Sequence, residues 1–386
     1  MRSIRKLLTF PRIVLLCLLI GFTSAFLIYL SAPAVPVTAV DFLGQATLPT
    51  GFSFQGTSLG GLSGITYDPN KKVYYAISDD RSQKAPARFY TIKIDLSKGS
   101  LNDGSVVPIG VTTLLDETNQ PFATGSLDPE GIALTGKGTV FISSEGNAER
   151  LIEPFIKEFS LSSGRQLRTF AVPSKFLPVA SRDRGIRNNL AFESLTITPN
   201  QEYLFTATEN ALIQDGSSSK SKTSSRCRIL QYNLLTSNIE REFLYLTEPL
   251  AALLNLPGKF SSGLVDLLAL DNQGHFLSLE RSFNGLGFTI KLFEVSLEEA
   301  DDIGNIDSLS AIDLNTIKPV QKQLLLDFKM LNLPLDNIEG LTFGPEMADG
   351  RRPLILVSDN NFQFVQRTLI LALGIRTRFG SPSSIP

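Results

Sequence analysis

The sequence has few of the side chains on which many enzyme sites depend. Its 386 residues include one histidine, His275, two cysteines, Cys17 and Cys227, and no tryptophan. Because one cysteine lies in an apolar N-terminal run, no intrachain disulfide framework is expected, and a zinc site is poorly supplied with ligands. A Ser-His-Asp triad would have to use His275. We place that residue away from the acidic edge described below and expect it to be structural or exposed.

Net charge and helical periodicity are also lacking. The chain has 36 basic and 38 acidic residues, so no overall field favours a nucleic acid or another polyanionic partner. After residue 40 no stretch keeps a helical period. Short β-rich runs alternate with turn signals instead, which is typical of an all-β protein.

The N-terminus carries the one long apolar run. Residues 13–30 contain no charge, follow a basic segment, 1–12, and precede an Ala/Pro/Val-rich segment, 31–39. This order is typical of an export signal, and the run reaches the lower limit of a membrane span. We therefore expect a basic cytoplasmic tail, a membrane anchor, a linker, an extracytoplasmic (periplasmic) domain of residues 40–378 and a tail, 379–386. Cleavage of the anchor, giving a secreted protein, is the alternative.

A hairpin pattern repeats along the rest of the chain. Most copies begin near an acid, continue as an apolar strand, turn, and end on a second acid. Because an antiparallel hairpin returns to the edge from which it started, the opening and closing acids share one edge. The copies cover residues 62–80, 129–146, 192–210, 265–281 and 338–360.

The arrangement of further strands predicts a closed ring. Two more strands follow each of the first four hairpins, whereas one strand, 368–375, follows the fifth. A spare strand, 40–48, lies at the other end and would complete the last sheet. We predict an all-β β-propeller of five four-stranded blades, or six if one hairpin is degraded. The N-terminal strand would close it, and one N-terminal apolar helix would precede it.

Acidic side chains are predicted to gather at one mouth of this propeller. The first strand of a blade lines the central channel, so the opening acids would ring the mouth and the closing acids would lie just outside. Such a ring raises its own pKa values and needs cations, either a hard metal such as Ca²⁺ or nearby arginines. The opening acids are Glu130, Glu193, Asp266 and Glu339, and the closing acids are Asp79, Glu145, Glu209, Glu280 and Asp359.

Metal-assisted phosphoester hydrolysis fits this set, because it needs carboxylates, a metal and cationic phosphate contacts but no histidine. The candidate catalytic residues are Glu130, Glu193, Glu209, Asp266 and Glu339. The candidate metal ligands are Asp79, Glu145, Glu280 and Asp359. The candidate phosphate contacts are Arg81, Arg187 and Arg281.

A non-catalytic alternative stays open. Strand-end acids can be solvated or bonded to backbone amides, and repeats share residues for purely structural reasons. In that case the propeller would be an extracytoplasmic binding scaffold that presents long loops to an unknown ligand. In either case we expect a monomer whose partner is a small phosphoester or another ligand, and not a nucleic acid.

Several short motifs resemble the phytase-like family, known as "esterase-like activity of phytase". They are GLSGITYD at 61–68, DPEG at 128–131, RNN at 187–189, FESL at 192–195, IEG at 338–340 and SDNNF at 358–362. The resemblance implies a propeller, export and phosphoesterase activity, while the calcium-using β-propeller phytases are only distantly similar. Ser194 departs from the Glu-Gly pairs Glu130-Gly131 and Glu339-Gly340.

Overall fold

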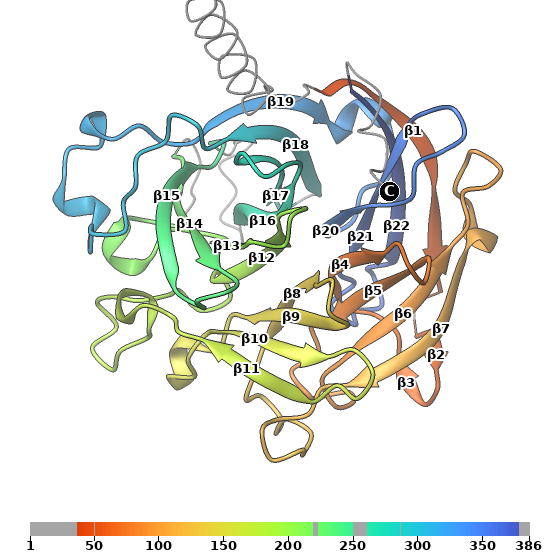
Figure 1. Ribbon diagram of the computed structural model, residues 1–386, viewed down its shortest axis with the longest axis horizontal. Helices are drawn as coiled ribbons and strands as arrows, with labels where there is room; N and C mark the ends of the chain where they lie inside the picture. Colours follow the sequence, from red (N-terminus) through yellow and green to blue (C-terminus); the bar gives the residue numbers. More distant parts are fainter. Residues whose placement is uncertain (1–36, 50, 219–222, 250–260, 286, 378–386) are drawn as a thin grey trace, which may run out of the picture. The chain divides into compact units, whose positions relative to one another are not determined.

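The computed structural model describes residues 37–49, 51–218, 223–249, 261–285 and 287–377. Within this part, five four-stranded antiparallel sheets form the blades of a β-propeller, and a two-stranded hairpin, β2 (Ser53–Phe54) with β3 (Thr57–Ser58), precedes blade 1. Figure 1 shows the blades around a common centre. The predicted all-β, five-bladed fold is therefore confirmed.

In blades 1 to 4 the strands follow the chain from the centre outward. Blade 1 contains β4 (Leu62–Asp68), β5 (Val73–Ser78), β6 (Arg88–Ile94) and β7 (Val106–Thr113). Blade 2 contains β8 (Pro129–Leu134), β9 (Thr139–Ser144), β10 (Phe155–Ser160) and β11 (Gln166–Phe170). Blade 3 contains β12 (Phe192–Ile197), β13 (Tyr203–Thr208), β14 (Arg226–Asn233) and β15 (Ile239–Leu246). Blade 4 contains β16 (Ser261–Ala269), β17 (His275–Phe283), β18 (Phe288–Ser296) and β19 (Gln321–Asp327).

Blade 5 closes the ring as the sequence predicts. It contains β20 (Ile338–Phe343), β21 (Arg352–Ser358), β22 (Thr368–Thr377) and, as its outer strand, β1 (Val37–Leu48). The outer strand pairs antiparallel with β22, with Val40 opposite Ile375 and Leu48 opposite Thr368. One sheet thus joins the two ends of the described chain. The described blades form a closed ring and lack the open edges that a linear row of blades would have at its two ends.

Glycines let the inner strands approach closely around the centre, where β4, β8, β12, β16 and β20 contact one another in cyclic order. A Cβ atom on Gly64 would lie 2.6 Å from the Glu130 carbonyl oxygen, and one on Gly340 would lie 2.8 Å from that of Ser63. Both distances are too short for a side chain, so these positions require glycine. A Cβ atom on Gly131 would lie 2.9 Å from the Glu193 carbonyl oxygen, so the same close approach explains both Glu-Gly pairs in the sequence.

In blade 4, Asp266 takes the place that Gly64 has in blade 1 and Gly340 has in blade 5. Its carboxylate accepts hydrogen bonds from the backbone N–H groups of Leu267 and Leu341, each at 2.8 Å, and from the backbone of Leu195. These donors belong to blades 4, 5 and 3. The side chain therefore joins three blades by hydrogen bonds at a position where blades 1 and 5 have glycine.

The N-terminal expectations need a correction. The expected anchor at residues 13–30 and the segments 1–12 and 379–386 lie outside the described residues. Among the residues that are described, no helix has the length and apolar character needed to cross a membrane. We therefore withdraw the expectation of a single-pass membrane protein.

Candidate functional site

A β-bulge in each first strand decides which side chains reach the channel mouth. Near the start of β4, β12, β16 and β20 the pairing with the second strand skips one residue, and in β8 it leaves out two residues against one of β9. A skipped residue leaves the regular ladder and turns away from its neighbours. The residues outside the pairing are Ser63, Glu193, Val265 and Glu339, and in β8 Glu130 together with Gly131.

Blade 4 differs from the sequence prediction by one residue. Glu280 pairs with Leu264, so it corresponds to Ser78, which pairs with Leu62 in blade 1. Val265 therefore takes the place of an opening acid, and Arg281 takes the place of a closing acid. A shift of one residue along a strand moves a side chain to the other face. The alignment of Asp266 and Glu280 with the opening and closing acids of the other blades was thus wrong.

Glu280 is instead anchored beside blade 3. Its carboxylate accepts hydrogen bonds from the Tyr245 hydroxyl at 2.7 Å and the Glu248 backbone N–H at 2.8 Å, and it pairs with Lys322 at 2.5 Å. With these three partners, Glu280 has a structural environment. Neither Glu280 nor Asp266 lines the pocket at the mouth.

The structure brings the other predicted acids together with one that sequence reasoning missed, Asp128. Its signal was its place in the DPEG motif, directly before the strand that carries Glu130. We define the mouth cluster as Asp79, Asp128, Glu130, Glu145, Glu193, Glu209, Glu339 and Asp359. Asp79 is half-buried, and every other side chain of the cluster is at most 7% exposed.

Two groups of carboxylates within the mouth cluster lie at cation-binding distances. One oxygen each from Asp128, Glu130 and Glu145 lie within 4.8 Å of one another, and so do oxygens of Glu145, Glu193 and Glu209. Glu145 is common to both groups. Carboxylate oxygens in such numbers are the ligands that Ca²⁺ prefers.

One oxygen of Glu145 lacks a partner among the described residues. Its Oε1 atom accepts a hydrogen bond from the Ala191 backbone N–H, whereas the buried Oε2 atom accepts none. A buried carboxylate oxygen without a donor is costly, and a bound cation would satisfy it. The donor set thus fits a hard metal ion.

Burial and crowding raise the pKa values of the mouth cluster. Burial raises the pKa of Asp128 to about 6, although Arg81 opposes the shift. Burial raises the pKa of Glu209 to about 7 against the effect of Arg281, and burial with Glu339 raises that of Asp359 to about 8. Burial and neighbouring carboxylates also raise the pKa values of Asp79, Glu130, Glu145 and Glu193 well above the usual range.

Arg281 is the arginine that enters the cluster. Its guanidinium lies 2.9 Å from Glu339 and 3.3 Å from Glu209. Burial alone would lower the pKa of Arg281, but these carboxylates outweigh that effect and raise it. Its buried Nε atom has no acceptor among the described residues.

The other two predicted phosphate contacts lie at different places. Arg81 donates to Asp128 at 2.6 Å and also to Asn189, so it borders the cluster. Arg187 donates instead to the backbone carbonyls of Ala211 and Gly216. It therefore supports a loop, and it does not line the mouth pocket.

A cavity of about 830 Å³ opens beside the mouth cluster, which is large enough for a small ligand. Glu130, Glu193, Glu339 and Asp359 line it together with Arg281. Asn337 donates to Glu339 at 3.0 Å and to Asp359 at 3.4 Å, so it fixes these two carboxyls beside each other. We refer to this cavity as the mouth pocket.

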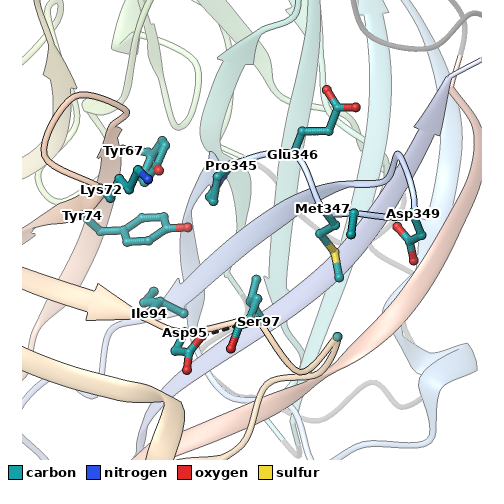
Figure 2. A pocket seen from close by; sticks show the side chains of 13 residues that line it. Tyr67, Lys72, Tyr74, Ile94, Asp95, Ser97, Pro345, Glu346, Met347 and Asp349 are labelled. Carbon is teal, nitrogen blue, oxygen red and sulfur yellow. Dashed lines mark hydrogen bonds between the residues drawn. The ribbon is translucent and has the colours of Figure 1, made fainter.

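A second cavity, of about 450 Å³, lies between blades 5 and 1 at the opposite edge of the sheets. Figure 2 shows Tyr74, Ile94 and Met347 around it, with Asp95 and Glu346 among the side chains at its border. The Tyr74 hydroxyl is buried without a partner among the described residues. This cavity contains none of the mouth cluster, so the mouth pocket is the candidate site.

The structure also places the residues relevant to a serine esterase. His275 begins β17 at the opposite edge, and its Nδ1 atom lies 2.7 Å from Asp271, whose hydrogen bond raises the histidine pKa. Residues 56–60 match the G-x-S-x-G pattern, but Ser58 lies in the two-residue strand β3 and not at a strand-to-helix turn. Neither residue lines the mouth pocket.

The fold and the mouth cluster define a β-propeller with an acidic channel mouth. The chain belongs to the phytase-like family: the family model, "Esterase-like activity of phytase", matches residues 57–362. No curated protein matches the chain.

Among solved structures, an endo-arabinase from Bacteroides thetaiotaomicron is similar at 13% identity and a TM-score of 0.43, over 87% of this chain and 99% of that one. A GH62 α-L-arabinofuranosidase catalytic domain from Coprinopsis cinerea is similar at 8% identity and a TM-score of 0.44, over 86% of this chain and 97% of that one. These TM-scores are below 0.5, and neither similarity carries an argument about activity.

Proposed function

We propose that this protein is a metal-dependent phosphoester hydrolase that acts in the mouth pocket. The observation that carries the proposal is the pair of carboxylate groups that share Glu145, with its partnerless buried oxygen. Asp128, Glu130, Glu145, Glu193 and Glu209 would hold Ca²⁺ or a similar hard cation. When bound, such a cation supplies positive charge that stabilises the phosphoryl group during transfer.

Arg281 and two neighbouring carboxyls would act on the substrate. Arg281 lines the pocket, so its guanidinium can bind a phosphoryl oxygen. Burial raises the pKa of Glu339, but its ion pair with Arg281 favours the charged form, which suits a base. Asp359, with a pKa of about 8, keeps its proton near neutral pH and suits an acid.

Glu339 and Asp359 account for both protons that the reaction moves. Water attacks phosphorus while Glu339 accepts one of its protons. The bond between phosphorus and the alcohol oxygen breaks, and Asp359 gives its proton to that oxygen. The products are inorganic phosphate and the free alcohol, and proton exchange with water restores the two carboxyls.

Phosphate release by the purified full-length chain tests the proposal. With Ca²⁺ present we expect turnover of a phosphate monoester, loss of turnover in a chelator, and recovery on adding Ca²⁺ back. Glu339→Gln should lower kcat by about 10²-fold or more. Glu346→Gln, at the border of the cavity in Figure 2, is the matched control and should keep full activity. Absence of metal-dependent turnover would contradict the proposal.

A binding-only function is the second candidate. The ion pairs of Arg281 with Glu209 and Glu339 favour it, because they already neutralise part of the charge that a phosphate would meet. In that case Ca²⁺ would bind without any phosphate release. Glu339→Gln would then leave any residual hydrolysis unchanged.

A further inference from the structure

Apolar side chains form one wall of the mouth pocket. Phe283 and Phe288 lie opposite each other at the end of the β17–β18 hairpin, with ring centroids 5.1 Å apart. Leu335 and Val365, from the connections before β20 and β22, extend this wall. The pocket therefore has an apolar part beside its acidic part.

The connection between β21 and β22 exposes large apolar side chains next to this wall. Val365 is 83% exposed although it lines the pocket, and its neighbour Phe364 is 92% exposed. Single exposed apolar residues are ordinary, but two in sequence at the border of a pocket offer a surface that a ligand could cover.

The charges of the pocket argue against a highly charged substrate. Its described lining includes two arginines, Arg281 and Arg367, and the second lies 3.6 Å from Asp336. Several carboxyls line the pocket as well, so each extra phosphate on a ligand would meet more acids than bases. The acids of this lining are Asp79, Glu130, Glu193, Asp336, Glu339 and Asp359.

We propose that the substrate is a phosphate monoester of an apolar alcohol or a phenol. Its single phosphate lies at Arg281, and its apolar group packs against Phe283, Phe288 and Val365. This inference rests on the proposed hydrolase function and specifies its substrate class. The bond changes are those given above, and the leaving group is the apolar alcohol or phenol.

The test compares three phosphate esters with the full-length protein and Ca²⁺: 1-naphthyl phosphate, glycerol 2-phosphate and inositol hexakisphosphate. Differential packing of one apolar group typically changes specificity by about 10- to 200-fold. We expect kcat/KM for 1-naphthyl phosphate to exceed the other two by at least about tenfold.

Substitution of Val365 shows where any preference arises. Val365→Asn should lower kcat/KM for 1-naphthyl phosphate by about threefold to tenfold and leave that for glycerol 2-phosphate unchanged. Because Val365 is 83% exposed, the fold should not depend on it. Leu235→Asn is the matched control, since Leu235 is 90% exposed in the β14–β15 turn of blade 3, outside the pocket lining.

The outcomes separate the two proposals. Equal turnover of the three esters, or a preference for inositol hexakisphosphate, would overturn this inference and leave the hydrolase function standing. An unchanged preference in Val365→Asn would also overturn it. Absence of turnover on all three esters would overturn the hydrolase function and the substrate class together.

Discussion

At the scale of single residues, Arg281 decides the charge of the mouth cluster. It stands where the other blades carry Asp79, Glu145, Glu209 or Asp359, and it pairs with carboxylates from blades 3 and 5. The sequence predicted Arg281 as a phosphate contact on this face but gave the closing position of blade 4 to Glu280, because a β-bulge leaves no mark in the apolar pattern. The same bulge explains why Asp266 was mistaken for a member of the ring.

Removing the Arg281 charge should destabilise the metal-free protein. Arg281→Gln leaves Glu209 and Glu339 buried without their cation, and breaking a buried pair in this way typically costs about 3–5 kcal/mol. Denaturant unfolding in a chelator measures the loss. Arg367→Gln is the control: the Arg367 side chain is 36% exposed, so its ion pair with Asp336 should contribute about 1 kcal/mol or less. Equal losses in the two variants would contradict this interpretation.

At the scale of strands, the sequence predicted more of the fold than of the site. Alternating apolar residues and turn signals gave the strands of all five blades, and the spare N-terminal strand gave the closure that β1 and β22 make. The contacts between blades could not be predicted from the sequence, because they depend on how closely the backbones of neighbouring inner strands approach at Gly64 and Gly340. Asp128 was missed for a related reason: it precedes its strand and is held by Arg81, far away in the sequence.

The inner strands should depend on Asp266. Asp266→Ala would leave the N–H groups of Leu267 and Leu341 without their acceptor at the meeting point of three blades. Loss of a buried acceptor typically costs about 1–3 kcal/mol for each group left unpaired, so we expect the two groups to lower the free energy of unfolding by roughly 2–6 kcal/mol. Asp266→Asn keeps one acceptor oxygen and should lose less. Chemical denaturation checks both variants, and an Ala variant as stable as the unmodified chain would refute the bridging role.

At the scale of the whole molecule, the closed ring gathers carboxyls from four blades, 1, 2, 3 and 5, into one buried cluster. Folding therefore opposes their ionisation unless a cation is bound. The raised pKa values, about 6 for Asp128, 7 for Glu209 and 8 for Asp359, mean that the folded chain binds more protons than the unfolded chain above about pH 4. Stability that is present at low pH is thus lost as pH rises through these values.

The melting temperature should show this dependence. In a chelator we expect Tm to fall between about pH 5 and pH 8, because the folded state gives up protons that it holds more tightly. At a concentration of 100-fold its Kd, Ca²⁺ should raise Tm by about 5 °C at pH 8. The rise should be smaller at pH 5. Differential scanning calorimetry at both pH values measures the shifts. A metal-free Tm that rises from pH 5 to pH 8 would contradict the raised pKa values.

Calorimetric titration of the full-length chain with Ca²⁺ near pH 7, in buffers of different ionisation enthalpy, tests the cation site in the mouth cluster most directly. We predict saturable binding with release of protons, because carboxyls with raised pKa values lose protons when a cation binds. Glu145→Gln should weaken the binding by at least about tenfold, because Glu145 belongs to both carboxylate groups. Absence of saturable binding, or binding that Glu145→Gln leaves unchanged, would contradict the proposed cation site.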